Sequence, residues 1–276
     1  TISRSFFSLP PVFFLSFLNS GIKRVSELYK PGTGNISEAF VTGFESMPLM
    51  ANLPILKNFS RFIPRPNWNL NWDGLEKFPI FSSFAKRVSL NHSYSSDYSE
   101  GWRIDPDGKQ VTQSQKISYG FQPLVGLTMT FNSLWNGNFS GNVKYSTKTG
   151  YDLGLSTQNI TETFSRDIGI SASYSKTGFD LPIFGLSLKN DIEITMSYTS
   201  SKNSVVIYNM NQFVEGGTPQ DGTIRTTLEP RIKYVISAKV TLSIFYRRSS
   251  VQPEGATRIS ATTTNEAGLD VHIAIQ

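Results

Sequence analysis

The two histidines, His92 and His272, are candidates for acid–base catalysis or metal binding. Asp270 and His272 are two residues apart in a segment of alternating polar and apolar residues, so both side chains lie on one face of an extended strand. A carboxylate beside an imidazole is a possible acid–base pair. No nucleophile and no second carboxylate pair can be identified around them, so we interpret them as polar side chains in water and expect no enzyme activity.

His92 shares one face of its segment with Leu90 and Tyr94, which predicts a place in an aromatic belt. A metal site needs several convergent His, Asp, Glu or Cys ligands, and this chain has two separated histidines and no Cys. The sequence also lacks a Gly-rich phosphate loop of the P-loop or dinucleotide type. We therefore expect no metal ion and no cofactor.

The elements that must position these residues are strands, because strict alternation with period two runs through most of the chain. In the last segment one face carries Ala267, Leu269, Val271, Ile273 and Ile275, and the other carries Glu266, Gly268, Asp270 and His272. Full charges on the second face of this and earlier segments exclude a dry core there. We predict that this face lines a water-filled lumen, with these candidates: Asp191, Glu193, Glu229, Arg231, Lys233, Arg247, Glu266, Asp270 and His272.

Composition leaves a membrane barrel and a secreted β-sandwich as the two open fold classes. Charged residues make up only 17% of the chain, below the ~25% typical of soluble domains. No uncharged apolar run reaches the ~18 residues of a membrane helix. The net charge of +5 is mild, and the densest basic spot is Arg247-Arg248, so nucleic acid is not an expected partner.

Aromatic residues and link lengths favour the barrel. Tyr and Phe residues gather near predicted strand ends, as in the aromatic girdles of outer-membrane barrels. Short links at 132–136 and 237–239 alternate with longer ones at 100–113, 210–222 and 250–262, although the link at 176–185 is long for its place. We predict an all-β, antiparallel transmembrane barrel of about ten strands with a periplasmic C-terminus.

Residues 12–63 interrupt the alternation, and the strands are expected within 64–276 of a single domain, 1–276. Asn35 followed by Glu38 predicts a capped helix over residues 36–45, in an extracellular excursion. Residues 78–81 predict a further helical turn on the periplasmic side. Residues 6–18 are apolar but contain two prolines and no clear cleavage site, so we expect a strand end and a loop there. Because the chain starts at Thr1 without an export signal, we expect a fragment.

Three stretches resemble the C-terminal part of the SprA family, the outer-membrane translocons of type IX secretion and gliding motility in Bacteroidetes. The first is PNWNLNWDGLEKFP at 66–79, followed by VSLNHSY at 88–94. The second is FQPLVG at 121–126. The third is the final hairpin, with Phe245-Tyr246, Thr264-Asn265 and the segment 269–276. Residues 5–10 (SFFSLP) are similar to a strand that precedes these stretches, whereas the excursion departs from the family pattern.

The resemblance implies one arc of a very large barrel in the bacterial outer membrane. It implies protein export without catalysis, with membrane lipid, secreted cargo proteins and other secretion subunits at a lateral opening and at the periplasmic mouth as partners. Both edges of the arc, 2–8 and 267–275, should then be open. The alternatives are a small self-contained porin or barrel enzyme, whose first and last strands must pair, and a secreted adhesin-like sandwich.

Overall fold

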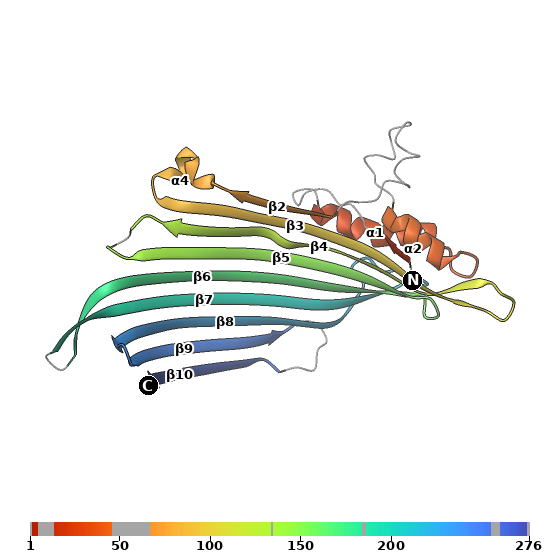
Figure 1. Ribbon diagram of the computed structural model, residues 1–276. Helices are drawn as coiled ribbons and strands as arrows, with labels where there is room; N and C mark the ends of the chain where they lie inside the picture. The colour runs from red at the N-terminus through yellow and green to blue at the C-terminus, as the bar shows by residue number, and fades with distance from the viewer. Residues whose placement is uncertain are drawn as a thin grey trace.

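Ten antiparallel strands form one sheet in the computed structural model, which describes residues 2–4, 14–45, 67–133, 135–183, 186–254 and 260–274. The spatial order is β1-β3-β4-β5-β6-β7-β8-β9-β10, and β2 also pairs with β3 (Figure 1). The strands are β1 (Ile2–Arg4), β2 (Trp68–Asp73), β3 (Ala85–Ile104), β4 (Gln110–Phe131), β5 (Asn138–Gly154), β6 (Asn159–Ile183), β7 (Leu186–Asn209), β8 (Thr218–Ser237), β9 (Val240–Pro253) and β10 (Thr262–Ile273). The predicted all-β antiparallel class and strand number are confirmed.

The sheet is open among the described residues. β1 and β2 both lie along the same side of β3, and neither pairs with β10 at the other edge. This agrees with the predicted open arc and removes the pairing that a closed ten-strand barrel would need between Ile2–Arg4 and β10. Residues 5–8 and 275 of the two predicted edges lie outside the described part.

The strands are longer, and two of the links between them shorter, than the sequence predicted. The predicted long links at 100–113 and 176–185 are mostly strand, because β3 runs to Ile104, β4 begins at Gln110, and β6 and β7 extend to Ile183 and from Leu186. Asp105 closes the first turn, since its carboxylate accepts the backbone N–H groups of Asp107 and Lys109. β6 has 25 residues, far more than the ~9–11 that cross a bilayer.

Two helices precede β2 and form a pair at the long-loop end of the sheet (Figure 1). Helix α2 (Ile36–Glu45) was predicted, and Asn35 caps it: its side-chain oxygen accepts the N–H groups of Ser37 and Glu38 at 3.1 and 3.4 Å. Helix α1 (Phe14–Leu28) was not predicted, so the expectation of strand and loop over 6–18 is wrong for residues 14–18.

The buried positions of α1 explain this error, because Ile22, Val25 and Tyr29 recur at helical spacing on one face. The two prolines that argued against a regular element lie upstream of Phe14. The helices approach closely: a Cβ at Gly43 would lie 2.6 Å from Val25 Cγ2. No helix in the described ranges is both long and apolar enough to cross a membrane.

Two short turns follow β2, η2 (Leu75–Lys77) and α4 (Pro79–Ser82), and the second confirms the helical turn predicted near residues 78–81. Glu76 ties this segment to the sheet, because its carboxylate accepts the Val88 N–H at 3.0 Å. That hydrogen bond is the main reason why the pKa of Glu76 lies below its ordinary value.

Candidate lipid-facing band and polar wall

Apolar side chains form a continuous row across the sheet. Strand register places them directly opposite one another from β5 to β10: Phe139, Tyr174, Ile194, Ile232, Ile244 and Leu269. Ile232, Ile244 and Leu269 are 44%, 48% and 61% exposed, so no second layer of the described chain covers this face. A soluble monomer rarely leaves so wide an apolar surface exposed.

A second row extends the apolar face to the other edge of the sheet. Here the register aligns Trp72, Leu90, Leu127, Val143, Ile170, Tyr198 and Leu228. We call the apolar face formed by these two rows and the side chains between them the apolar band. It includes Leu242, Val271 and Ile273 of β9 and β10 as well, which share this face with Ile244 and Leu269.

Aromatic rings border the apolar band on both sides. Towards the short turns, Phe84, Phe131 and Phe139 lie side by side, with ring centroids 6.0 and 4.9 Å apart, and Trp135 contacts Tyr174. Towards the long loops the bordering rings are Trp68, Tyr94, Phe121, Tyr145, Tyr198 and Tyr246.

The aromatic borders are separated by an apolar stretch of strand. Phe139 and Tyr145 are six residues apart on β5, about 20 Å along the strand. Outer-membrane barrels carry an apolar band about 25 Å tall between two aromatic girdles, on strands tilted by about 35–45°. The arrangement of the band is that of such girdles, although the distance on β5 is shorter than that height.

The opposite face of the same strands is built from small polar residues and glycine. One residue along from the second apolar row, the register aligns Asn71, Asn91, Gly126, Lys144, Gly169, Thr199, Thr227, Ser249 and Thr264. We call this face the polar wall. Side chains of this kind are readily hydrated and expose little apolar surface.

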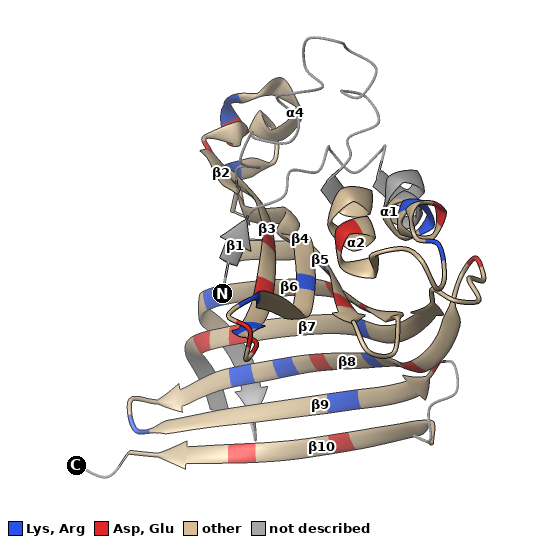
Figure 2. Ribbon diagram, turned by 90° about the vertical axis from the view of Figure 1, so that its right-hand side faces the viewer, with Lys and Arg blue, Asp and Glu red and all other residues tan. Residues whose placement is uncertain are grey.

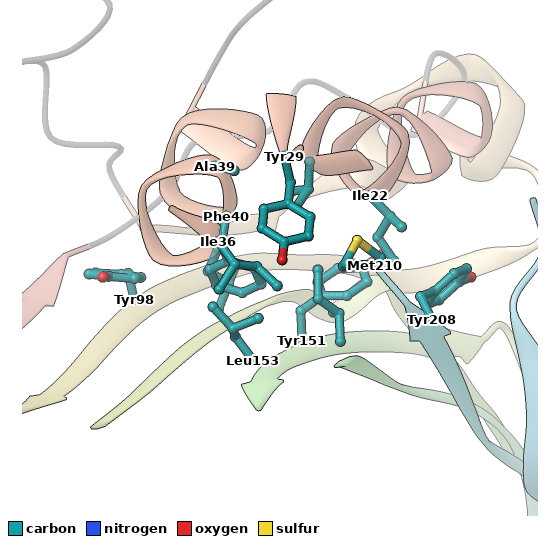
Figure 3. Close-up of a cluster of buried hydrophobic side chains, with 13 residues drawn as sticks. Ile22, Tyr29, Ile36, Ala39, Phe40, Tyr98, Tyr151, Leu153, Tyr208 and Met210 are labelled. Atoms are coloured by element: carbon teal, nitrogen blue, oxygen red, sulfur yellow. The ribbon is translucent and has the colours of Figure 1, made fainter. Parts of the chain in front are cut away.

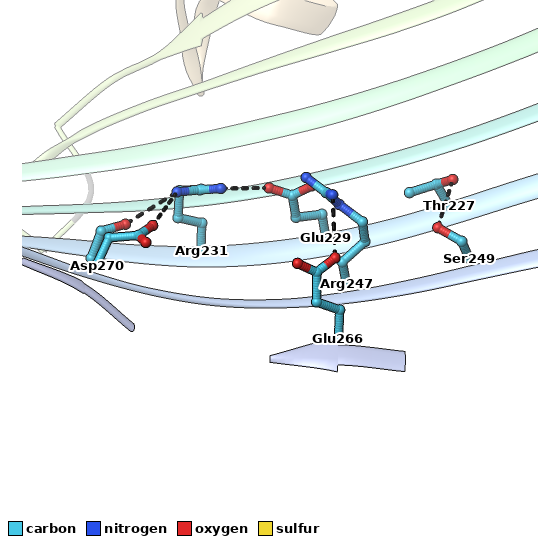
Figure 4. A network of polar contacts seen from close by, with 8 residues as sticks. Thr227, Glu229, Arg231, Arg247, Ser249, Glu266 and Asp270 are labelled. Atoms are coloured by element: carbon cyan, nitrogen blue, oxygen red, sulfur yellow. Dashed lines mark hydrogen bonds and ion pairs between the residues drawn. The ribbon is translucent and has the colours of Figure 1, made fainter. Parts of the chain in front are cut away.

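Five of the nine predicted lumen residues form one charged network on the polar wall (Figures 2 and 4). Glu229 lies at its centre and accepts Arg247 Nε at 2.8 Å and Arg231 Nη2 at 3.0 Å. Each arginine also reaches a carboxylate on β10: Arg247 contacts Glu266 at 3.4 Å and Arg231 contacts Asp270 at 3.8 Å. The network joins β8, β9 and β10 while largely neutralising its own charge.

The other four predicted residues lie on the polar wall outside this network. Lys233 and Glu193 form a separate pair at 3.8 Å between β8 and β7. Asp191 and His272 are exposed near the ends of their strands. Among the described residues, Asp270 forms its ion pair with the Arg231 guanidinium and not with His272. In the described ranges no three His, Asp or Glu side chains gather where a metal ion could bind.

Phe245 is a member of the polar wall that the sequence reasoning did not identify. Its ring lies between two guanidinium groups, 4.8 Å from Arg231 and 5.9 Å from Arg247. It also covers Gly268 on β10, where a Cβ would lie 2.5 Å from the ring. Phe245 lies between Ser243 and Arg247 in the alternating pattern, and this spacing places its side chain on the polar face.

His92 supports an irregularity between β3 and β4. The register shifts after Asn91 on β3 and between Phe121 and Val125 on β4, and His92 Nδ1 lies 2.7 Å from the Leu124 carbonyl oxygen freed there. His92 lies beside the Trp68 and Phe121 rings, consistent with its predicted aromatic surroundings. On the polar wall the same irregularity borders a hollow of about 310 Å³ lined by Asn69, Asn71, Asn91, Gln122, Asn142 and Lys144.

The helix pair covers a second apolar patch at the long-loop end (Figure 3). Ile22, Val25, Tyr29, Ile36 and Phe40 pack there against these strand residues: Tyr98, Ile117, Tyr151, Leu153, Ile160, Tyr208 and Met210. Tyr151 and Leu153 have the same strand parity as Val143, so the helices lie on the side of the apolar band. A polar row of Thr147, Arg166 and Lys202 separates the two apolar surfaces.

A partly buried polar contact anchors the helix-covered patch. Tyr208 donates its hydroxyl hydrogen to Glu162 Oε2 at 2.8 Å, and Tyr151 donates to Glu162 Oε1 at 3.2 Å. Burial raises the pKa of both phenols above the ordinary value, and for Tyr208 the hydrogen bond to Glu162 raises the pKa further. Both tyrosines therefore remain protonated donors at physiological pH.

No protein-family model and no curated protein sequence matches this chain. Function is therefore inferred from the two faces of the sheet.

Proposed function

We propose that this chain forms part of the wall of an outer-membrane protein translocon, of the type that serves type IX secretion and gliding motility. The apolar band contacts lipid, and the polar wall lines the conduit for exported proteins. The observation that carries the proposal is the second apolar row and the polar row beside it, because apolar and polar side chains alternate in register from β2 to β8.

The lipid side follows from backbone and side-chain requirements. In lipid every backbone N–H and C=O must be paired within the protein, and the interior strands of this sheet meet that requirement through their ladders. Ile232, Ile244 and Leu269 are unfavourable in water and favourable in lipid, since moving such a side chain out of water contributes about 1.5–3 kcal/mol. The aromatic borders then fit the two membrane interfaces.

The polar side suits the passage of proteins. Apart from Phe245, the residues named in its rows are Ser, Thr, Asn, Gly and charged residues, and the charges of Glu229, Arg231 and Arg247 are paired with one another and with β10. Paired charges keep the surface wet without creating a strong field of one sign. A wide conduit with such a lining would hold cargo in water and bind it weakly.

Two features support a large conduit over the alternatives. A small porin of these strands would pair β10 with β1 or β2, and the described strands do not. An adhesin-like sandwich would cover the apolar band with a second sheet, whereas the described chain has one sheet. The motifs that resemble the SprA family fall on β2 and β3, on the irregularity at 121–126 and on the β9–β10 hairpin. The further partners are secretion subunits at the lateral opening and the periplasmic mouth.

Site-specific photo-crosslinking tests the proposal. A photoreactive residue at Thr199 should capture an export substrate that is arrested during transport, whereas one at the neighbouring Tyr198 should react with lipid. The two positions differ by one residue and lie on opposite faces, so each is the control for the other. Capture of the arrested substrate from neither position, or equally from both, would reject the conduit.

A further inference from the structure

The open edge of β10 presents a defined set of backbone groups. Ala274 N–H donates to Lys239 O at 2.8 Å, which identifies these residues as a hydrogen-bonded pair. Such pairs alternate with non-bonded pairs along an antiparallel ladder. The backbone groups of the even-numbered residues of β10 therefore point to β9. Those of the odd-numbered residues point away from the sheet: Thr263, Asn265, Ala267, Leu269, Val271 and Ile273.

Part of this edge lies in the apolar band. Leu269, Val271 and Ile273 are aligned with Ile244, Leu242 and Val240 of the band. If the band contacts lipid, their outward N–H and C=O groups would have neither water nor a protein partner, which is a costly arrangement. A further strand is the element that satisfies all of them at once.

The charges on the edge indicate what kind of strand fits. The side chains of Glu266 and Asp270 are 54% and 64% exposed. Both contact arginines on the side of β8 and β9, and their other side faces the open edge. A strand with Lys or Arg beside these carboxylates would complete the charged network, since opposite charges across neighbouring strands are stabilising.

A second copy of this edge fits poorly. With Leu269, Val271 and Ile273 level, two antiparallel β10 strands would be centred on Val271 and would place His272 beside Asp270 and no Lys or Arg beside Glu266. A register shifted to centre on Asp270 would place two Asp270 carboxylates face to face. Like charges in that position are destabilising. The β2 edge of another copy would offer Asn69, Asn71 and Asp73 on its polar face, which include no cation.

We propose that β10 is closed by an antiparallel strand other than those described, with apolar residues beside Leu269, Val271 and Ile273 and with Lys or Arg beside Glu266 and Asp270. This inference rests on the proposed function, because the demand for a closing strand comes from the lipid environment. It adds the chemical character of the partner.

Amide hydrogen exchange at single-residue resolution, on the protein in native outer membranes, tests the closing strand. Thr263 and Asn265 lie beyond the aromatic border at Tyr246, where water reaches them, so lipid alone cannot protect their amides. The closing strand should slow their exchange at least 100-fold relative to unstructured peptide, to the level of Thr264 and Glu266. Exchange within tenfold of the unstructured rate would overturn the inference.

Charge variants test the character of the partner. Glu266→Lys should accelerate exchange at Asn265 at least tenfold, whereas Asp191→Lys, on the same face of interior strand β7, should leave it unchanged. An unaltered rate in Glu266→Lys would exclude a basic partner, and a disulfide-linked dimer of Val271→Cys, the residue on which two copies would be centred, would assign the edge to a second copy. Cysteine labelling of the apolar band and the polar wall tests the proposed function separately. If that labelling shows a lipid-facing and a water-facing side while the amides of Thr263 and Asn265 exchange freely, this inference is overturned and the proposed wall stands.

Discussion

Glu229 on β8 accepts a hydrogen bond from Arg247 on β9 at 2.8 Å, and the same carboxylate holds Arg231 at 3.0 Å. Hydrogen bonds between charged groups are stronger than neutral ones. Within the charged network Glu229 is the carboxylate that contacts both arginines, so its loss leaves two cations close to each other. This carboxylate should therefore matter more than any other acidic residue of the polar wall.

The first prediction is that Glu229→Gln lowers the unfolding temperature of the protein in detergent. The control is Glu193→Gln, because Glu193 meets Lys233 at a looser 3.8 Å with both side chains about half exposed, and such pairs contribute little. The control should change the unfolding temperature by less than half as much as Glu229→Gln. Equal shifts in the two variants would mean that the network has no special role.

A second prediction concerns the cap of α2. Asn35→Ala removes the acceptor of two backbone N–H groups and should cost about 1 kcal/mol of local stability. Amide exchange across residues 38–43 should accelerate accordingly. Ser37→Ala is the control, since the Ser37 side chain is not part of the cap. Unchanged exchange in Asn35→Ala would remove the cap from the account.

High pH should release the helix pair from the sheet. The pKa values of Tyr151 and Tyr208 are raised in the folded protein, whereas free tyrosine ionises near pH 10. The stability these phenols contribute is therefore complete below about pH 10 and is lost as the pH rises further towards their folded values. Protease cleavage between α1 and α2 should begin above pH 10.

The double variant Tyr151→Phe and Tyr208→Phe provides the control for this release. It lacks both ionisable groups, so its helix pair should respond less steeply to pH, although the loss of two hydrogen bonds to a carboxylate lowers its stability throughout. If both proteins become cleavable at the same pH, the tyrosines do not control the docking of the helices.

Period-two alternation made much of this fold predictable, and physical reasons explain the errors. The faces of Ile244 and Arg231 follow from strand geometry alone, and the cap at Asn35 follows from a local pattern. The strand ends around Ile104 and Ile183 were missed because turn residues and Gly were taken as long loops. These residues stay in strands because they form backbone hydrogen bonds with neighbouring strands. A local sequence pattern does not contain the position of those partners.

The charged network was predictable as a face but not as a set of contacts. Alternation placed Glu229, Arg247 and Glu266 on one side, whereas their pairing depends on the relative stagger of three strands. Helix α1 was missed for a different reason. Its buried residues Ile22 and Val25 pack on strands that follow more than seventy residues later, and the prolines upstream dominated the local reading.

Single-cysteine labelling tests the two-faced wall most directly. Cysteine replaces Ile194 or Ile244 of the apolar band and, on the same strands, Thr195 or Ser243 of the polar wall, and intact outer membranes are treated with a small water-soluble maleimide. Thr195→Cys and Ser243→Cys should react, and Ile194→Cys and Ile244→Cys should react only after detergent is added. Equal labelling of all four positions in the membrane would contradict a lipid-facing band and indicate a soluble sheet.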